Sequence, residues 1–379
     1  MTARLKIEIA GGGIAGLTAA AALAQRGHSV RVHESGDELR EIGAGLYLKR
    51  NSLEVLKRLE IFDELVKYAE RLHFGEIRDE HNRLLLRRTL GGEEAYTVLR
   101  GRLHELLASA ARAAGAQIVL SSKVVGANPD GVVAFANGDS ARADLIIGAD
   151  GVNSAIRDSV GLTKANDKLL DGAIRLLIPR VAADRGGLST EYWSSACRAG
   201  VVPCSPDHVY VFLIGPQEDS RVSQVPVDKA FWRQQFPQIT DVIDRIPSDV
   251  GRFSRHAFVT VNGWSRGRVA ILGDAAHAQP PNLGQGAGMS MANAAALAEL
   301  LDMHDDVGNA LAAWEASRRS VSEAVQRWSY RYGVLGYRWP SAFLGLRSMT
   351  IRAIGAMGPT SRRWGWLWRG GMNAPLSAL

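Results

Sequence analysis

The alternation of polar and apolar side chains near the N-terminus predicts a β-α-β unit. Residues 6–10 alternate as in a strand with one buried face, and a run of glycines follows them. Residues 16–26 are rich in Ala and Leu, which predicts a helix that Gly27 ends. Residues 29–34 alternate again as a second strand. Such a unit is the core of a doubly wound nucleotide-binding fold.

Apolar spacing predicts further elements along the chain. Helices are predicted at residues 51–69, 103–114, 293–301 and 307–319. A turn at Asn137-Gly138 between two apolar runs predicts a hairpin over residues 131–147. A buried strand is predicted at residues 269–272. Between these parts, residues 161–261 hold short β-rich runs separated by Pro and Gly, which predicts a separate, mostly antiparallel sheet.

The predicted fold class is therefore α/β, with a doubly wound Rossmann-like domain, an inserted antiparallel sheet and C-terminal helices. The nucleotide-binding domain is predicted to be discontinuous, at residues 1–70, 100–160 and 262–325. The substrate domain is predicted at residues 71–99 and 161–261, and a basic, Trp-rich helical segment at residues 326–379.

The first chemical motif lies between the first strand and the first helix, where residues 11–16 form the pattern GxGxxG. Gly11 permits a tight turn, Gly13 lets the backbone approach a pyrophosphate, and Gly16 allows the helix to pack closely on the strand. Glu34 ends the second strand, where a carboxylate accepts hydrogen bonds from a ribose and repels a 2′-phosphate. A glycine-rich turn alone would be weak evidence. Together these features predict FAD or NAD binding by Gly11, Gly13, Ile14, Ala15, Gly16 and Glu34.

Two further motifs follow buried strands. Asp150-Gly151 ends the apolar run 144–148, a pattern that a plain strand-end turn also produces. Asp274 ends the strand at 269–272, at the edge where open α/β sheets bind ligands. A Gly-rich loop then opens a helix whose N-terminus suits negative charge on a reduced flavin. For His277, which follows Asp274, we favour a packed structural histidine over a proton-transfer role.

Composition and charge exclude several classes of protein. The 379 residues contain no run of roughly 18–20 apolar residues, as a membrane span requires, and no signal peptide is recognised, so we expect a cytoplasmic protein. Cys197 and Cys204 are expected to be free thiols, and no Cys/His spacing predicts a metal site. The net charge of +6 comes from eight arginines after Glu323, which argues against a nucleic-acid-binding surface on the main domain.

The three motifs, in this order and spacing, resemble the class A, single-component FAD-dependent aromatic hydroxylases, the fold group of para-hydroxybenzoate hydroxylase. The resemblance covers residues 6 to about 325. It implies that Asp150 serves both FAD and the nicotinamide donor, and that Asp274 contacts the ribityl chain. It further implies flavin contacts by Arg40, Gly45, Arg100, Pro281, Gly284, Gly286, Ala287 and Gly288.

The resemblance also implies a reaction. NAD(P)H visits transiently and reduces FAD, O2 forms a flavin C4a-hydroperoxide, and one oxygen atom enters a hydroxylated aromatic or N-heteroaromatic ring. The cofactor carries this chemistry, so no protein nucleophile is expected. Whether NADH or NADPH is the donor stays open, as does the choice between a monomer and a homo-oligomer. No second GxGxxG is present, which excludes a second Rossmann domain of the disulfide-reductase type.

Within the family, the residues look most like the oxygenases of 2-methyl-3-hydroxypyridine-5-carboxylate, which implies a hydroxypyridine carboxylate-like substrate. Arg198, Tyr210 and Pro281 are the implied substrate-binding residues. From the residues alone, a surface arginine is the favoured interpretation of Arg198, and the resemblance makes substrate binding equally supported. Alternation along residues 209–214 puts Tyr210, Phe212 and Ile214 on one face, where core packing of Tyr210 is as well supported as substrate binding. Two further substrate tyrosines of that branch are replaced, because their approximate positions hold Gly75 and His256, so the substrate differs in size or polarity.

Three alternatives remain. The Trp- and Arg-containing segment from Trp328 to Trp368 resembles 2-alkylquinolone hydroxylases of the same family and is compatible with oxygenation of a lipid-like or alkene substrate. Packing against the FAD domain is favoured for this segment over membrane contact, pocket cover or an oligomer contact. A non-catalytic FAD-binding sensor is the second alternative. A halogenase is disfavoured because Trp366-Leu367-Trp368 continues with Arg369 and lacks the W-x-W-x-I-P pattern.

Overall fold

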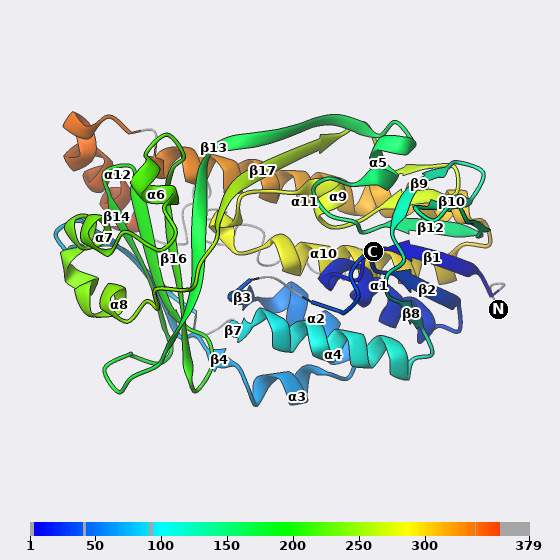
Figure 1. Ribbon diagram of the computed structural model, residues 1–379, viewed down its shortest axis with the longest axis horizontal. Helices are drawn as coiled ribbons and strands as arrows, with labels where there is room; N and C mark the ends of the chain where they lie inside the picture. Colours follow the sequence, from blue (N-terminus) through cyan, green and yellow to red (C-terminus); the bar gives the residue numbers. More distant parts are fainter. Residues whose placement is uncertain (1–3, 41–42, 91–93, 338, 357–379) are drawn as a thin grey trace.

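A computed structural model describes residues 4–40, 43–90, 94–337 and 339–356. It contains two large sheets side by side, with the dark blue strands of the N-terminus at one end and most of the green strands at the other (Figure 1). The α/β fold class predicted from the sequence is confirmed.

The first sheet is the doubly wound layer, with the strand order β18-β19-β12-β1-β2-β8. Its strands are β1 (Lys6–Ala10), β2 (Ser29–His33), β8 (Gln117–Val119), β12 (Leu145–Gly148), β18 (Ser265–Arg266) and β19 (Val269–Ile271). All pairings are parallel except that of β18 with β19. The carboxyl ends of β1, β12 and β19 therefore meet at one edge, each followed by one of the three chemical motifs.

Helices rich in Ala and Gly cover this sheet. The largest are α1 (Ile14–Ala24), α4 (Arg100–Ala113) and α10 (Gly286–Met303), and α1 contacts both of the others. Small side chains let α1 lie between the sheet and these helices, so nearly all of its residues are buried. The short helices α5 (Ala155–Ser159) and α9 (Asp274–His277) follow β12 and β19 directly.

Several predicted boundaries change. The helix predicted at 51–69 is two helices, α2 (Arg50–Arg58) and α3 (Phe62–Val66), because Glu60 adopts a left-handed φ of 60° between them. The hairpin is shorter than predicted: β10 (Val132–Phe135) and β11 (Ser140–Arg142) pair around Asn137-Gly138 and continue to β9 (Val124–Asn128). The apolar residues after β11 instead form β12 in the parallel sheet, where both faces are buried.

The second sheet has seven strands in the order β17-β13-β16-β15-β14-β5-β6. They are β5 (Phe74–Asp79), β6 (Leu84–Thr89), β13 (Thr163–Pro179), β14 (Leu188–Ser194), β15 (Cys197–Pro203), β16 (His208–Pro216) and β17 (Phe253–Val261). Only β14 and β5 pair in parallel. The predicted antiparallel character of this region agrees with the remaining pairings. How the chain divides into domains stays a prediction.

The two faces of the second sheet differ. On one face, Val209, Val211 and Leu213 of β16 form a core with α6 (Ser220–Ser223), α7 (Lys229–Gln235) and α8 (Thr240–Asp244). The alternate residues Tyr210, Phe212 and Ile214 line a cavity on the other face, as their alternation predicted. A small sheet of β3 (Gly45–Leu48), β7 (Tyr96–Leu99) and β4 (Glu70–Arg71) lies next to this cavity.

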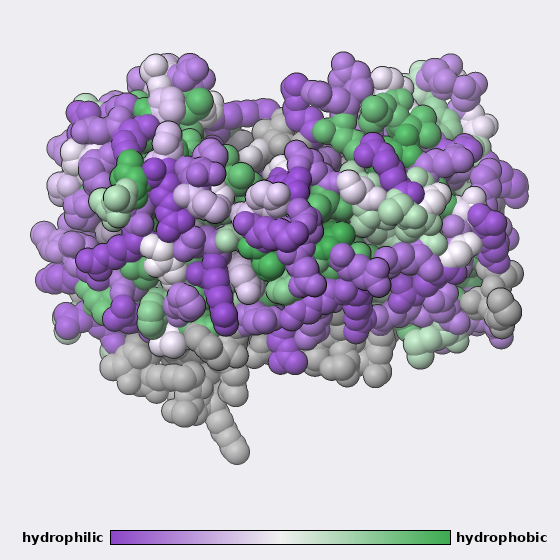
Figure 2. Space-filling model, turned by 90° about the horizontal axis from the view of Figure 1, so that it is seen from below, coloured by the Kyte–Doolittle hydropathy of each residue, from purple (hydrophilic) through white to green (hydrophobic). Residues whose placement is uncertain are grey.

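The C-terminal part of the described chain is helical. α11 (Val307–Tyr337) continues well beyond the predicted end at 319 and contacts β15 of the second sheet, and α12 (Leu344–Ala356) packs on β6. The Trp-rich stretch after residue 356 lies outside the described residues. No helix among the described residues is long and apolar enough to cross a membrane. Figure 2 shows a mostly hydrophilic face, with smaller hydrophobic patches between the hydrophilic residues.

Candidate active site

One cavity of about 990 Å³ joins the two sheets. It extends from the carboxyl edge of the first sheet across the inner face of the second sheet. Single drug-sized ligands occupy sites of about 300–1,000 Å³, so this volume is at the upper end of that range. Of the predicted site residues, the cavity is lined by Gly11, Gly13, Ile14, Ala15, Glu34, Gly45, Arg100, Asp150, Arg198, Tyr210, Asp274, Pro281, Gly284, Gly286 and Ala287.

The turn between β1 and α1 requires glycine. Gly11 has a φ of 102°, and a Cβ atom there would lie 2.4 Å from the carbonyl oxygen of Ala149. A Cβ at Gly16 would lie 2.0 Å from the carbonyl oxygen of Gly11. Helix α1 begins without a side-chain cap, so its first N–H groups are available to an anion. This geometry fits the pyrophosphate of a dinucleotide.

The Glu34 carboxylate is positioned by the backbone. Its Oε2 accepts a hydrogen bond from the Gly12 amide at 2.9 Å, and its Oε1 accepts one from the Gly36 amide at 2.9 Å. The ring of His104 lies 2.7 Å from the Gly12 carbonyl oxygen and supports the same turn. Each carboxylate oxygen can accept a further hydrogen bond, so Glu34 fits a ribose diol.

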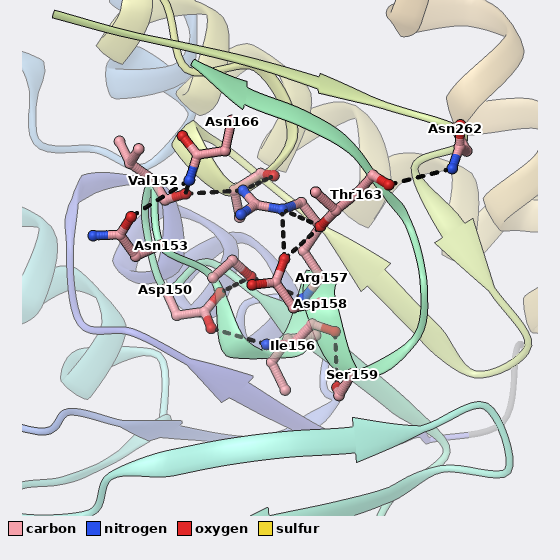
Figure 3. A network of polar contacts seen from close by, with 12 residues as sticks. Asp150, Val152, Asn153, Ile156, Arg157, Asp158, Ser159, Thr163, Asn166 and Asn262 are labelled. Carbon is pink, nitrogen blue, oxygen red and sulfur yellow. Dashed lines mark hydrogen bonds and ion pairs between the residues drawn. The ribbon is translucent and has the colours of Figure 1, made fainter. Parts of the chain in front are cut away.

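Asp150 binds the first turn of the helix that follows it, α5, whose N-cap residue is Ser154. Its carboxylate accepts hydrogen bonds from the Ser154 hydroxyl at 2.5 Å and from the Ile156 amide at 3.1 Å (Figure 3). The conformation of the Asp150-Gly151 segment is thereby fixed at the cavity wall. The direct role in nucleotide binding that the resemblance implies for Asp150 stays a prediction.

Arg157 connects two of the three motifs, a role that the sequence did not reveal. The side chain is 1% exposed, and its Nη1 donates to the carbonyl oxygens of Val152 at 3.0 Å and Ala275 at 3.1 Å. Its Nε donates to the Thr163 hydroxyl at 2.9 Å (Figure 3). Val152 follows the Asp150 motif and Ala275 lies in α9, so Arg157 fixes these two segments relative to each other.

Asp274 and the loop after it complete the flavin end of the cavity. The Asp274 side chain is exposed, at the cavity wall. Gly284 has a left-handed φ of 60° and packs against the ring of Tyr47. The ammonium group of Lys49 donates to the carbonyl oxygen of Leu283 at 2.9 Å and so positions this loop. Helix α10 then begins at Gly286 without a side-chain cap, which fits negative charge on a flavin ring.

Three predicted cofactor residues do not line the cavity. Gly16 lies inside the β1–α1 contact, and Gly288 packs against the Asn51 side chain. Arg40 is 72% exposed at its side chain and pairs with Glu38 at 2.5 Å. Arg100, in contrast, lies at the cavity wall beside Gly43. The cofactor roles of all these residues stay predictions.

Arg198 is buried rather than at the surface, with a side chain that is 1% exposed. Its Nη1 lies 3.1 Å from Glu191 Oε1, and its Nη2 donates to Asn282 Oδ1 at 2.6 Å. Glu191 also accepts hydrogen bonds from the Tyr332 hydroxyl at 2.8 Å and the Trp193 indole at 3.0 Å. The charge of Arg198 is therefore already compensated by Glu191.

Tyr210 lies at the centre of the cavity wall. Its ring packs so closely on Gly45 that a Cβ atom there would lie 2.7 Å from it. Burial raises the pKa of the Tyr210 hydroxyl, opposed by the nearby charges of Arg175 and Arg100 and by a hydrogen bond with Arg175. Tyr210 is thus both a packed residue and a cavity residue, and Arg175 is a neighbour that sequence reasoning did not identify.

A buried Asp-His pair lies at the cavity as well. His256 Nδ1 is 3.0 Å from Asp171 Oδ2, and both side chains are about 2% exposed or less. Burial lowers the pKa of His256, opposed by Asp171. Burial would raise the pKa of Asp171, but the hydrogen bond and charge of His256 bring it below its ordinary value. These two pKa directions favour an ionised Asp171, which accepts from Nδ1–H, and a neutral His256 ring. The Nε2 atom of this ring has no described hydrogen-bond partner.

The remaining candidate groups are structural. His277 is buried, its Nε2 lies 3.1 Å from Asn293 Nδ2, and its ring packs on Trp264, which agrees with the packed histidine favoured from the sequence. Cys197 and Cys204 are free and buried, and burial raises the pKa of each thiol to about 12. No cluster of metal-ligating side chains occurs among the described residues.

The fold and the site together define a dinucleotide-binding α/β protein with a second sheet over its active-site cavity. A family model described as an FAD binding domain matches residues 4–329, and the chain belongs to that family. FAD is therefore its cofactor, and NAD(P)H is the standard co-substrate of this class.

Comparison with known proteins narrows the assignment within this family. It is 38% identical to a probable 2-heptyl-3-hydroxy-4(1H)-quinolone synthase of Rhodococcus erythropolis, over 89% of this chain and 90% of the relative. It is 36% identical to the 2-heptyl-3-hydroxy-4(1H)-quinolone synthase of Mycobacteroides abscessus, over 87% and 90%. The solved tetrameric form of 2-methyl-3-hydroxypyridine-5-carboxylic acid oxygenase matches with a TM-score of 0.83 and 35% identity, over 92% and 93%. The chain is an FAD-dependent monooxygenase of the aromatic hydroxylase class.

We expect Gly11→Ala to abolish tight FAD binding, because the new Cβ would overlap the Ala149 carbonyl at a φ that disfavours L side chains. The FAD content of the purified protein, read from its absorbance spectrum, should fall to less than about a tenth of that of the wild type. Gly345→Ala is the control, since Gly345 lies in α12 with open space around its Cβ position. Wild-type FAD affinity in the Gly11 variant would contradict this account of the turn.

We expect Arg157→Met to weaken both folding and FAD binding. Methionine retains the apolar stem but leaves the buried carbonyl oxygen of Ala275 without its described donor, while the Val152 carbonyl keeps only Asn166 Nδ2. The free energy of unfolding should fall by about 2 kcal/mol, since one unpaired buried polar group costs about 1–3 kcal/mol. Chemical denaturation and FAD titration measure the two effects. A stable variant with unchanged FAD affinity would show that Arg157 does not position the two motifs.

Proposed function

We propose that the protein inserts one oxygen atom into an N-heteroaromatic ring that carries an oxygen substituent, of the 4-quinolone or hydroxypyridine type. The observation that carries this proposal is one continuous cavity, whose flavin end joins the inner face of the second sheet. A ring bound on that face lies next to the cofactor. When bound, FAD supplies the electrons from NAD(P)H that activate O2.

The chain's own residues orient the ring and exclude water. Tyr210 and Phe212 place two aromatic rings on the cavity wall, with centroids 5.7 Å apart. Flat aromatic walls favour a flat substrate, and their apolar surface keeps water from the reacting atoms. Pro281, in the loop before α10, borders the same space and connects the flavin end with the substrate end.

The pairing of Arg198 bears on the choice of substrate. Glu191 and Asn282 accept from its two terminal nitrogens, and its buried Nε has no described hydrogen-bond partner. A substrate carboxylate would therefore have to compete with Glu191 for this charge. This supports an uncharged ring of the 4-quinolone type over a hydroxypyridine carboxylate. The quinolone synthases among the relatives also support it, and the likeness to the hydroxypyridine carboxylate oxygenase supports the second candidate.

The His256–Asp171 pair supplies a proton acceptor for such a ring. With Asp171 ionised and bound to Nδ1–H, the buried Nε2 keeps a lone pair, and we propose that this lone pair accepts the proton of a ring N–H or O–H. Loss of that proton raises the electron density of the ring, which favours attack on an electrophilic oxygen. Asp171 orients the imidazole and stabilises its protonated form, and it acts as a positioning residue.

Other features of the protein stay proposals. A homo-oligomer is supported by the tetrameric form of the related oxygenase. A cytoplasmic location agrees with the lack of a membrane-spanning helix among the described residues, and membrane or nucleic-acid partners have no support beyond the arginines of the C-terminal segment. Oxygenation of an alkene and a purely FAD-sensing role are the two alternatives to this function, and neither predicts that a heteroaromatic ring stimulates NAD(P)H oxidation.

We expect a 4-quinolone or hydroxypyridine to stimulate NADH or NADPH oxidation at least about tenfold and to yield a product with one added oxygen atom. Oxygen uptake, nicotinamide absorbance and mass spectrometry of the product measure this across a panel of quinolones, hydroxypyridine carboxylates and hydroxybenzoates. Labelling with 18O2 identifies the source of the oxygen. Flavin-loaded protein that none of these rings stimulates would overturn the proposed function.

We expect His256→Gln to lower kcat/KM by about 10²-fold, in the range of general-base effects. In the wild type, kcat/KM should rise with pH through the lowered pKa of His256 and then level off, because only the neutral ring accepts a proton. The charged groups acting on it are Asp171 and Arg175 of β13 and Arg198 of β15, and the adjacent α9 carries Asp274 and His277.

Asp171→Asn provides the sharper test of the pair. Without the carboxylate, the protonated imidazole loses stabilisation, so the pKa of His256 falls further and the acid limb of kcat/KM moves to lower pH. The plateau should also fall, since a weaker base removes the proton more slowly. His28→Gln is the matched control, because His28 is a buried histidine 3.6 Å from Asp302, and it does not line the cavity. Unchanged pH profiles in both cavity variants would exclude the proton-acceptor role.

A further inference from the structure

The substrate cavity continues past the aromatic rings toward the β5–β6 edge of the second sheet. We propose that this end of the cavity is an apolar arm that binds an alkyl chain on the ring substrate, and that Gly75 opens it. The arm is lined by Leu72, Ile77, Leu86, Leu90, Leu335 and Ile351. The proposal rests on the proposed function, because it adds a substituent to the ring that is oxygenated.

The strand register places Gly75 on the cavity face. Gly75 lies opposite Ser189 of β14 and Arg88 of β6, and Ile77 lies opposite Glu191 and Leu86. All six residues line the cavity, as expected for positions that share one face of a sheet. A Cβ atom at Gly75 would meet no described heavy atom within 4 Å, apart from its chain neighbours. Glycine here leaves open space where any other residue would project a side chain.

The opposite wall of the arm comes from the C-terminal helices. Leu335 belongs to α11 and Ile351 to α12, and Ile351 belongs to a buried cluster with Leu85 and Trp193, against which Ile77 and Leu86 pack. Aliphatic groups from two strands and two helices therefore line the arm. Such a lining takes much of a methylene chain out of water, which favours a chain over a small polar substituent.

The charged groups near the arm are paired, which excludes a cationic tail as the natural occupant. Glu191 accepts from Arg198 and Tyr332. Glu76, which also reaches the cavity, lies 2.8 Å from Arg78 and 3.2 Å from Arg87. Both carboxylates thus already have cationic or hydrogen-bonding partners. Arg88 and Ser189 lie opposite Gly75 at the mouth of the arm, and the other residues that line it are aliphatic. An uncharged alkyl chain fits this surface.

A series of 4-quinolones with 2-alkyl chains of one to nine carbons tests the arm. The probe is each quinolone itself, and its dissociation constant is read from the change that it causes in the flavin absorbance of the oxidised holoenzyme. In the wild type, we expect affinity to rise about fourfold for each methylene until the arm is filled. A dissociation constant that does not depend on chain length would overturn the proposal.

Gly75→Leu places an isobutyl group in the arm. We expect the ratio of affinities for the longest and shortest chains to fall at least tenfold, and the ratio of their kcat/KM values to fall in parallel. Leu335→Phe narrows the arm from α11 and should reduce the same ratios, so the test does not depend on one variant folding well. Gly345→Leu, on the exposed face of α12 with equally open space, is the matched control and should leave both ratios unchanged.

The outcomes separate the arm from the proposed function. If alkylated rings bind with the chain-length dependence but are not oxygenated, the arm stands and the proposed function fails. If rings of every chain length, including alkyl-free hydroxypyridines, bind and react equally, the proposed function stands and the arm is overturned. A loss in Gly75→Leu that is equal for short and long chains also overturns the arm, because it would indicate general damage to the site.

Discussion

The contact between the turn at Gly11 and the carbonyl oxygen of Ala149 is the constraint on which the active site depends. The Gly11 amide donates to the His33 carbonyl at 2.8 Å, and the Ala149 amide donates to the Ala10 carbonyl at 2.8 Å. These bonds bring the ends of β1, β2 and β12 to one point, where no Cβ atom fits. The start of α1, the Glu34 carboxylate and the Asp150 segment consequently lie on the same cavity. A nucleotide site that depends on close backbone approach tolerates little substitution.

Buried charge pairs shape the rest of the cavity. Arg157 donates to four acceptors and connects α9 with the β12–α5 segment, while Arg198 is compensated by Glu191. Burial of such charges is costly unless every group finds a partner, so these networks fix specific arrangements rather than add much stability. In this protein they connect segments that are distant in the sequence. These networks thereby hold the walls of the cavity in fixed relative positions, as a site for both a cofactor and a substrate requires.

The sequence predicted the features that local patterns determine. The GxGxxG turn, Glu34 and Asp274 each follow a strand directly, so the periodicity of the strands was enough to place them at one edge. The alternation of β16 likewise predicted that Tyr210 and Phe212 share a face. The role of Arg157 was not predictable in this way, because its acceptor at Ala275 is 118 residues away. The break near Glu60 depends on a left-handed residue that no helix-spacing pattern shows.

The structure gives a physical meaning to the sequence differences at Gly75 and His256. At their approximate positions, the hydroxypyridine branch has tyrosines. The replacement of these tyrosines predicted a substrate of different size or polarity, but not which of the two properties changes. The register of β5 shows that Gly75 opens space on the cavity face, and His256, paired with Asp171, lines the same cavity from β17 at the opposite edge of the sheet. Under the proposed function, the first replacement makes room for an apolar chain, and the second provides a proton acceptor for the ring.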